Sequence, residues 1–67
     1  MAMNDLLSDM LTRIRNGQHA HLAKVGAQYS NLLANVCDVL KREGYIKDWA
    51  KTGDVNKPCL EIHLKYH

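Results

Sequence analysis

The sequence has 67 residues, a net charge of +2 with neutral histidines, and two cysteines. A chain of this length forms only one small domain, and two widely separated cysteines exclude a disulfide scaffold and favour a reduced, intracellular setting. No apolar run approaches the roughly 20 residues of a membrane span, and acids stand near the start, where a signal or transit peptide carries cations. We therefore expect a soluble protein, cytosolic or made inside an organelle, with no membrane partner.

The first expected element is a helix over residues 4–16. Asn4 or Asp5 suits its N-cap, and Asn16-Gly17 suits its end because glycine adopts positive φ freely. Its apolar side chains recur at helical spacing, at Met3, Leu7, Met10, Leu11 and Ile14.

Residues 22–27 have a weak strand pattern in which Leu22 and Val25 are the apolar anchors. A second helix is expected from Ser30, its N-cap, to Glu43, and Gly44 suits a left-handed end. This helix has a broad apolar face, formed by Leu32, Leu33, Val36, Cys37, Val39 and Leu40.

After the second helix the apolar period changes to two, which is typical of strands. One strand is expected over Tyr45–Lys51 and another over Cys59–Tyr66, separated by the polar turn TGDVNKP. In the last strand, Leu60, Ile62, Leu64 and Tyr66 share one face, opposite Cys59, Glu61, His63 and Lys65. The order α-β-α-β-β predicts an α+β domain with two helices on one face of a short antiparallel sheet.

The basic residues are unevenly distributed. Between Asp9 and Asp38 there is no acidic residue, whereas the interval contains Arg13, Arg15, His19, His21 and Lys24. Such an interval fits a polyanionic partner, but chance clustering in a short chain explains it equally well.

The segment TRIRNGQ, which begins at Thr12, poses the same alternative. Arg13 follows Asp9 by four residues, a spacing that supports a helix. Thr12 and Asn16 share the outer face, and Arg15 has no acid four residues before it. Arginines near a helix end serve the helix dipole or contact phosphates, and the segment alone leaves both readings open.

Other chemistries find little support. The histidines and cysteines do not converge on a metal-ligand spacing, and the carboxylates are scattered without a catalytic motif, so we expect no metal, no cofactor, no small-molecule substrate and no enzymatic activity. The aromatic residues lack the pattern of an RNA-stacking sheet. Core or edge packing is the expected role of Tyr45, Trp49 and Tyr66. Any RNA contact should therefore be mainly to backbone and shape.

Three segments carry a resemblance to a known family: DMLTRIRNG (residues 9–17), VLKREGYIKD (residues 39–48) and LKY (residues 64–66). In this order and spacing they resemble the N-terminal half of bacterial-type small-subunit ribosomal protein S-eight. The resemblance implies direct binding to the central domain of small-subunit ribosomal RNA, a role in its assembly, repression of a ribosomal-protein messenger in bacterial members, and a place on a cytoplasmic or organellar ribosome beside neighbouring small-subunit proteins.

The resemblance also implies which residues contact RNA. Thr12, Arg13, Arg15 and Asn16 match the family's first-helix motif, and Lys24 matches a common basic position. Ser30 and Asn31 fall where members of the family usually have Ser-Lys. Asn31 therefore lacks the positive charge that the lysine of other members carries.

Members of the family have two α+β subdomains, of which residues 1–67 resemble only the first, and the sequence stops at His67 directly after a strand. We therefore expect a single N-terminal domain with the C-terminal subdomain absent. A small sheet of this kind has a poorly protected edge or face. The alternative reading is thus a protein-interaction module that docks through its exposed sheet to the missing half or to a second copy, without RNA specificity of its own.

Overall fold

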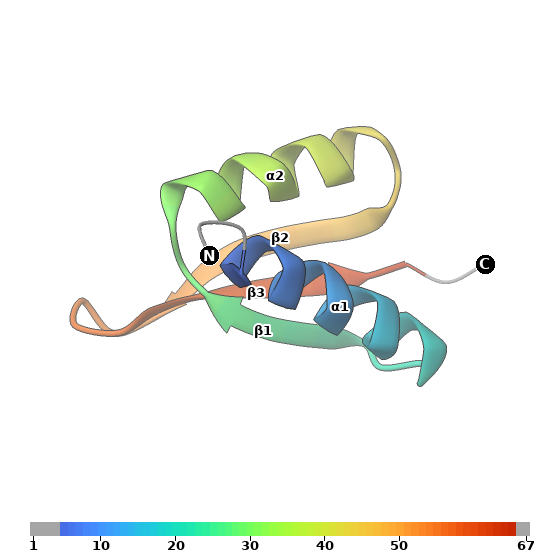
Figure 1. Ribbon diagram of the computed structural model, residues 1–67, viewed down its shortest axis with the longest axis horizontal. Helices are drawn as coiled ribbons and strands as arrows, with labels where there is room; N and C mark the ends of the chain where they lie inside the picture. The colour runs from blue at the N-terminus through green and yellow to red at the C-terminus, as the bar shows by residue number, and fades with distance from the viewer. Residues whose placement is uncertain (1–4, 66–67) are drawn as a thin grey trace.

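The computed structural model describes residues 5–65 and contains two helices and three strands (Figure 1). The elements follow one another as α1 (Asp5–His19), β1 (Lys24–Gln28), α2 (Asn31–Arg42), β2 (Ile46–Gly53) and β3 (Pro58–Leu64). The predicted α+β class and the α-β-α-β-β order are confirmed. The positions expected for Met3, Asn4 and Tyr66 lie outside the described residues.

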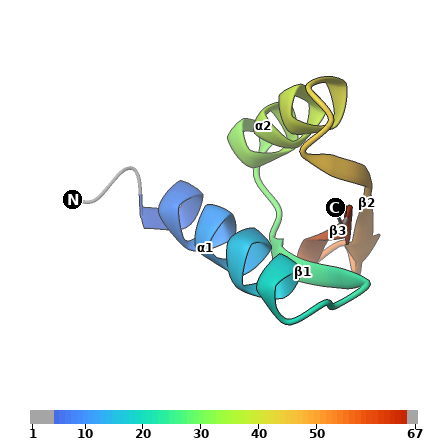
Figure 2. The ribbon, with the colours of Figure 1, turned by 90° about the vertical axis from the view of Figure 1, so that its right-hand side faces the viewer.

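The sheet is antiparallel with the strand order β1-β3-β2, so β3 is central and the other two strands form its edges. Pairing runs from Lys24 opposite His63 to Gln28 opposite Cys59 on one side. Both helices lie on the same face of this sheet, as the two views together show (Figures 1 and 2). No helix or strand among residues 5–65 covers the opposite face (Figure 2).

The core lies between the helices and the covered face of the sheet. Its buried side chains are Met10, Ile14, Leu33, Ala34, Cys37, Ile46, Leu60, Ile62 and Leu64. β3 supplies three of them at alternate positions, as its sequence predicts, because successive strand residues point to opposite faces. Among the three strands, β3 contributes the most buried side chains, which agrees with its central position in the sheet.

The boundaries of α2 agree with the prediction. Ser30 is the N-cap, and its hydroxyl oxygen accepts a hydrogen bond from the backbone N–H of Leu33 at 3.1 Å. Gly44 follows the helix with a φ of 84°, the left-handed conformation that glycine tolerates best. The apolar face is narrower than expected, because Leu32 and Val39 are 55% and 47% exposed. The two helices diverge from one another above the sheet (Figure 2).

The predicted end of α1 at Asn16-Gly17 is wrong. The helix continues to His19, and the backbone N–H of Ala20 still donates to the carbonyl of Asn16 at 2.9 Å. In the turn after α1, the residue with positive φ is His21, at 59°.

Gly17 has a packing role rather than a terminating one. It is buried against the sheet, and a Cβ atom at this position would lie 2.6 Å from Cγ1 of Val25 and 2.7 Å from Cδ1 of Leu64. A glycine in the helix therefore permits the close approach of α1 to β1 and β3.

The strand limits also shift. β1 begins at Lys24, not at residue 22, because the turn after α1 extends to residue 23 and leaves Leu22 48% exposed. β2 begins one residue after Tyr45 and continues past Lys51 to Gly53, which shortens the expected turn to residues 54–57.

Candidate nucleic-acid interface

Four of the exposed side chains in the last two turns of α1 lie on its outer face. They are Thr12, Arg15, Asn16 and His19, which we call the α1 outer strip. At about 100° per residue these positions fall within roughly 100° of the helix circumference, opposite the buried Ile14 and Gly17. The strip contains no acidic residue, so its charge comes from Arg15.

The two arginines that flank Ile14 have different surroundings. Nε of Arg13 lies 2.8 Å from Oδ2 of Asp9, an ion pair predicted from the spacing of four residues. Arg15 is exposed and forms no ion pair or hydrogen bond with any of the residues 5–65. The charge of Arg13 is thus partly compensated within the protein, and the charge of Arg15 is not.

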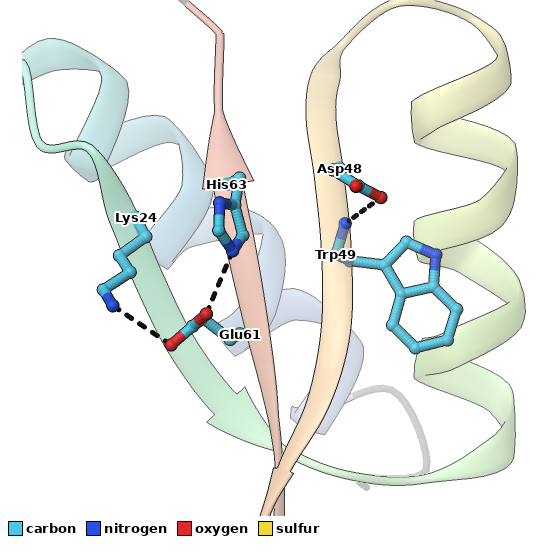
Figure 3. A network of polar contacts seen from close by, with 5 residues as sticks. All are labelled: Lys24, Asp48, Trp49, Glu61 and His63. Carbon is cyan, nitrogen blue, oxygen red and sulfur yellow. Dashed lines mark hydrogen bonds and ion pairs between the residues drawn. The ribbon is translucent and has the colours of Figure 1, made fainter.

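Lys24 lies elsewhere, on the open face of the sheet (Figure 3). Its Nζ is 3.1 Å from Oε2 of Glu61, whose other oxygen is 3.0 Å from Nε2 of His63. The hydrogen bond from Lys24, followed by that from His63, lowers the pKa of the Glu61 carboxyl from its ordinary value of 4.5. Lys24 is therefore a member of a polar cluster on the sheet face opposite α1, and not of the α1 outer strip.

Asp48 extends the polar character of the open face to β2. Its carboxylate accepts the backbone N–H of Trp49 at 2.8 Å and lies 3.1 Å from Nζ of Lys41. The backbone hydrogen bond, and after it Lys41, lowers the pKa of Asp48 from 3.8. Trp49 itself points toward α2, where its indole N–H donates to Asp38 at 2.9 Å. Pairing with β3 places no Tyr or Trp of the described strands on the open face, so this face provides no base-stacking platform.

Ser30 and Asn31 lie at the opposite end of the sheet from Lys24, because β1 runs the length of the sheet between them (Figure 1). Ser30 is occupied as the cap of α2, and the amide oxygen of Asn31 accepts a hydrogen bond from the Tyr29 hydroxyl at 3.2 Å. The structure thus brings Thr12, Arg15 and Asn16 together and leaves the other predicted residues at separate places.

His19 joins the α1 outer strip only through the full length of α1 in the structure. The helix was expected to end at residue 16, and only its continuation places His19 one turn beyond Arg15 on the same face. Arg15 and His19 are four residues apart in the sequence, but the intervening Asn16-Gly17 predicted a helix end between them.

The described residues contain no group of three or more histidine, cysteine or acidic side chains placed to hold a metal ion. Within the same part of the chain, neither helix has the length and apolarity needed to cross a membrane.

Comparison with known proteins identifies one family. The family model described as ribosomal protein S8 matches residues 5–67. Among similar proteins, the small ribosomal subunit protein uS8 of Chromobacterium violaceum is 55% identical over all 67 residues of this chain and 51% of its own length. The uS8 protein of Alteromonas mediterranea is 54% identical over 98% of this chain and 50% of its own length. The uS8 protein of Neisseria meningitidis serogroup B is 54% identical over 100% of this chain and 51% of its own length.

The chain spans about half the length of the relatives it matches. The match covers nearly the whole chain and agrees with the three segments that suggested the family from the sequence. It places the chain in a family of ribosomal proteins and not in a family of enzymes. The chain belongs to the ribosomal protein S8 family.

Proposed function

We propose that this chain is a structural component of the small ribosomal subunit that binds ribosomal RNA through the α1 outer strip. One observation carries the proposal: Arg15, exposed and without an ionic partner among residues 5–65, lies on a helix face shared with Thr12 and Asn16. The names of the relatives support the ribosomal part, since each is a small ribosomal subunit protein.

The chemistry of the strip suits a phosphate backbone. The guanidinium of Arg15 offers paired donors that match two phosphate oxygens. The Thr12 hydroxyl and the Asn16 amide add neutral donors on either side. Hydrogen bonding to the phosphate backbone, together with helix shape, is therefore the mode of recognition that fits the strip.

The other residues predicted to contact RNA are part of the proposal, but we expect each to contribute less to RNA affinity than Arg15. Arg13, Lys24, Ser30 and Asn31 each have a hydrogen-bonding partner within the protein. An RNA phosphate would have to share or displace that partner, which reduces the net gain from the contact.

Residues 1–67 correspond in this proposal to the N-terminal subdomain of longer relatives, working on a cytoplasmic ribosome beside neighbouring small-subunit proteins. Central-domain small-subunit RNA is the expected ligand, and assembly of that region is the expected role. The chain spans about half the length of its relatives, and in this proposal the second half of a longer relative adds to RNA specificity.

A filter-binding titration of the chain with central-domain RNA at several salt concentrations tests the proposal. Neutralising three phosphates gives a slope of roughly −2 to −3 in log K against log salt. An unrelated RNA duplex of equal length is the control for specificity. Binding that does not depend on salt overturns the proposal, as does no binding even when the second half of the Chromobacterium violaceum relative is added as a separate polypeptide.

A further inference from the structure

A groove of about 710 Å³ lies between the first part of α1 and one end of the sheet. Leu6, Asp9 and Arg13 form one wall, residues 26–29 of β1 and the loop after it form the floor, and residues 56–59 close the end. We call this the β1-edge groove. Its volume is within the range of roughly 300–1,000 Å³ that is typical of ligand sites.

The floor of the groove is the edge of β1 and not one of its faces. Four consecutive residues, 26–29, line it, whereas a strand face would present only every second residue. The backbone N–H of Tyr29 donates to Pro58 at 3.2 Å, and Ala23 accepts from Leu64 at 3.0 Å, so odd-numbered residues bond to β3. Alternation along an antiparallel ladder then directs the N–H and C=O groups of Gly26 and Gln28 outward, toward the groove.

The two edges of the sheet differ in their protection. Edge strands usually carry bulges, prolines or charges that prevent a further strand from pairing. β2 has an irregular register between Ile46 and Asp48, with Lys47 at that point. β1 pairs with β3 in continuous register, and its segment 26–28 contains neither proline nor charge. No strand among residues 5–65 occupies its outer side.

We propose that the β1-edge groove binds an extended polypeptide segment of a partner protein, which adds a fourth strand beside β1 and places an acidic side chain near Lys57. A peptide backbone supplies donors and acceptors at the spacing that Gly26 and Gln28 require. Lys57 lines the groove and has no ion pair among the described residues, whereas Arg13 is already paired with Asp9.

A peptide fits this site better than a nucleotide does. The carboxylate of Asp9 stands in the groove wall and repels a phosphate, and Leu6, Leu33 and Pro58 provide apolar surface for alternate side chains of an added strand. The inference does not rest on the RNA-binding proposal, because the α1 outer strip and the groove use different residues. It does give the sheet-docking alternative a definite location, on the edge of the sheet.

The test is a titration of the isotope-labelled chain with the blocked pentapeptide acetyl-EVTVE-amide, followed by amide chemical shifts. We expect saturable shifts at Gly26 and Gln28 by about 5 mM peptide. The same peptide N-methylated at its three central residues lacks the backbone donors and should produce no saturable shift. Because this comparison uses the unmodified chain, it does not depend on the folding of any variant.

Two pairs of variants sharpen the result. Gly26→Pro removes one outward N–H and should weaken peptide binding about fivefold, whereas Gly26→Ala keeps it and should bind normally. Lys57→Ala should also weaken binding, whereas Lys47→Ala on the other edge should not.

The proposal is overturned if the N-methylated peptide binds equally well, or if no saturable shift occurs at Gly26 and Gln28. It is also overturned if uridine monophosphate, and not the peptide, shifts the groove residues, since the groove would then belong to nucleic acid. Salt-dependent RNA binding measured separately keeps the two proposals distinguishable.

Discussion

Nε of Arg13 lies 2.8 Å from Oδ2 of Asp9 on the flank of α1, whereas Arg15, two residues later, has no ionic partner among residues 5–65. The two arginines are neighbours in one motif but face different directions, because a step of two residues turns a helix by about 200°. Arg13 borders the β1-edge groove, and Arg15 belongs to the α1 outer strip.

Replacement of Arg15 by alanine should weaken binding to central-domain RNA about tenfold and reduce the salt slope by about one, because one phosphate contact is lost. The free energy of unfolding should change by less than about 0.5 kcal/mol, since the side chain is exposed. Filter binding and urea denaturation measure the two quantities.

Arg13→Ala is the matched control and should have the smaller effect on RNA affinity, with a small loss of stability from the exposed pair with Asp9. If Arg13→Ala weakens RNA binding and Arg15→Ala does not, the α1 outer strip is the wrong surface.

Gly17→Ala should lower the free energy of unfolding by about 1 kcal/mol. Alanine is the better helix former by about 1 kcal/mol, but its Cβ would meet Val25 and Leu64 at less than 3 Å, and overpacking typically costs about 1–3 kcal/mol. Gly26→Ala is the control, because a Cβ there meets only a backbone oxygen of Leu60 at 3.8 Å. A stabilised Gly17→Ala variant would show that α1 shifts freely over the sheet.

The lowered pKa of Glu61 gives the stability a definite dependence on pH. A carboxyl whose pKa is lower in the folded state stabilises the fold above its unfolded pKa, near 4.5, and this contribution is lost as pH falls through the folded pKa. Asp48 adds a contribution of the same sign, which is present above its unfolded pKa of 3.8 and is lost at lower pH. Melting temperatures of the wild type and of Glu61→Gln should therefore differ at neutral pH and converge as the pH falls below 4.5 and through the folded pKa of Glu61.

Glu43→Gln is the control for this experiment, since Glu43 is exposed and forms no ion pair within the described part of the chain. Its melting curve should follow the wild type across the whole range. A constant difference between the wild type and Glu61→Gln at every pH would contradict the assigned role of the Lys24–Glu61–His63 cluster.

The two cysteines should react very differently with a thiol reagent. Cys37 is fully buried against Met10, and burial, with a smaller effect of Asp38, raises its pKa to about 11, so reactive thiolate is scarce. Cys59 is exposed. We expect one fast-reacting thiol per native chain and a second only after denaturation. Fast reaction that persists in Cys59→Ser would contradict this assignment.

Local signals in the sequence predicted several elements well. Ser30 and Gly44 bound α2 because a cap hydroxyl and a left-handed glycine act within a few residues of the helix end. The alternation of Leu60, Ile62 and Leu64 predicted β3 because side-chain direction in a strand depends only on position. The three family segments are likewise readable without coordinates.

Tertiary packing decided the rest. Asn16-Gly17 has the local character of a helix end, yet α1 continues because Gly17 is held against Val25 and Leu64, the second of which is 47 residues away in sequence. The strand register places Lys24 on the face opposite the helices, whereas Arg15 lies on α1. The sequence by itself thus determined the element order, the core positions of β3 and the family. The grouping of candidate residues required the fold, because distances across the sheet are set by strand pairing and not by spacing along the chain.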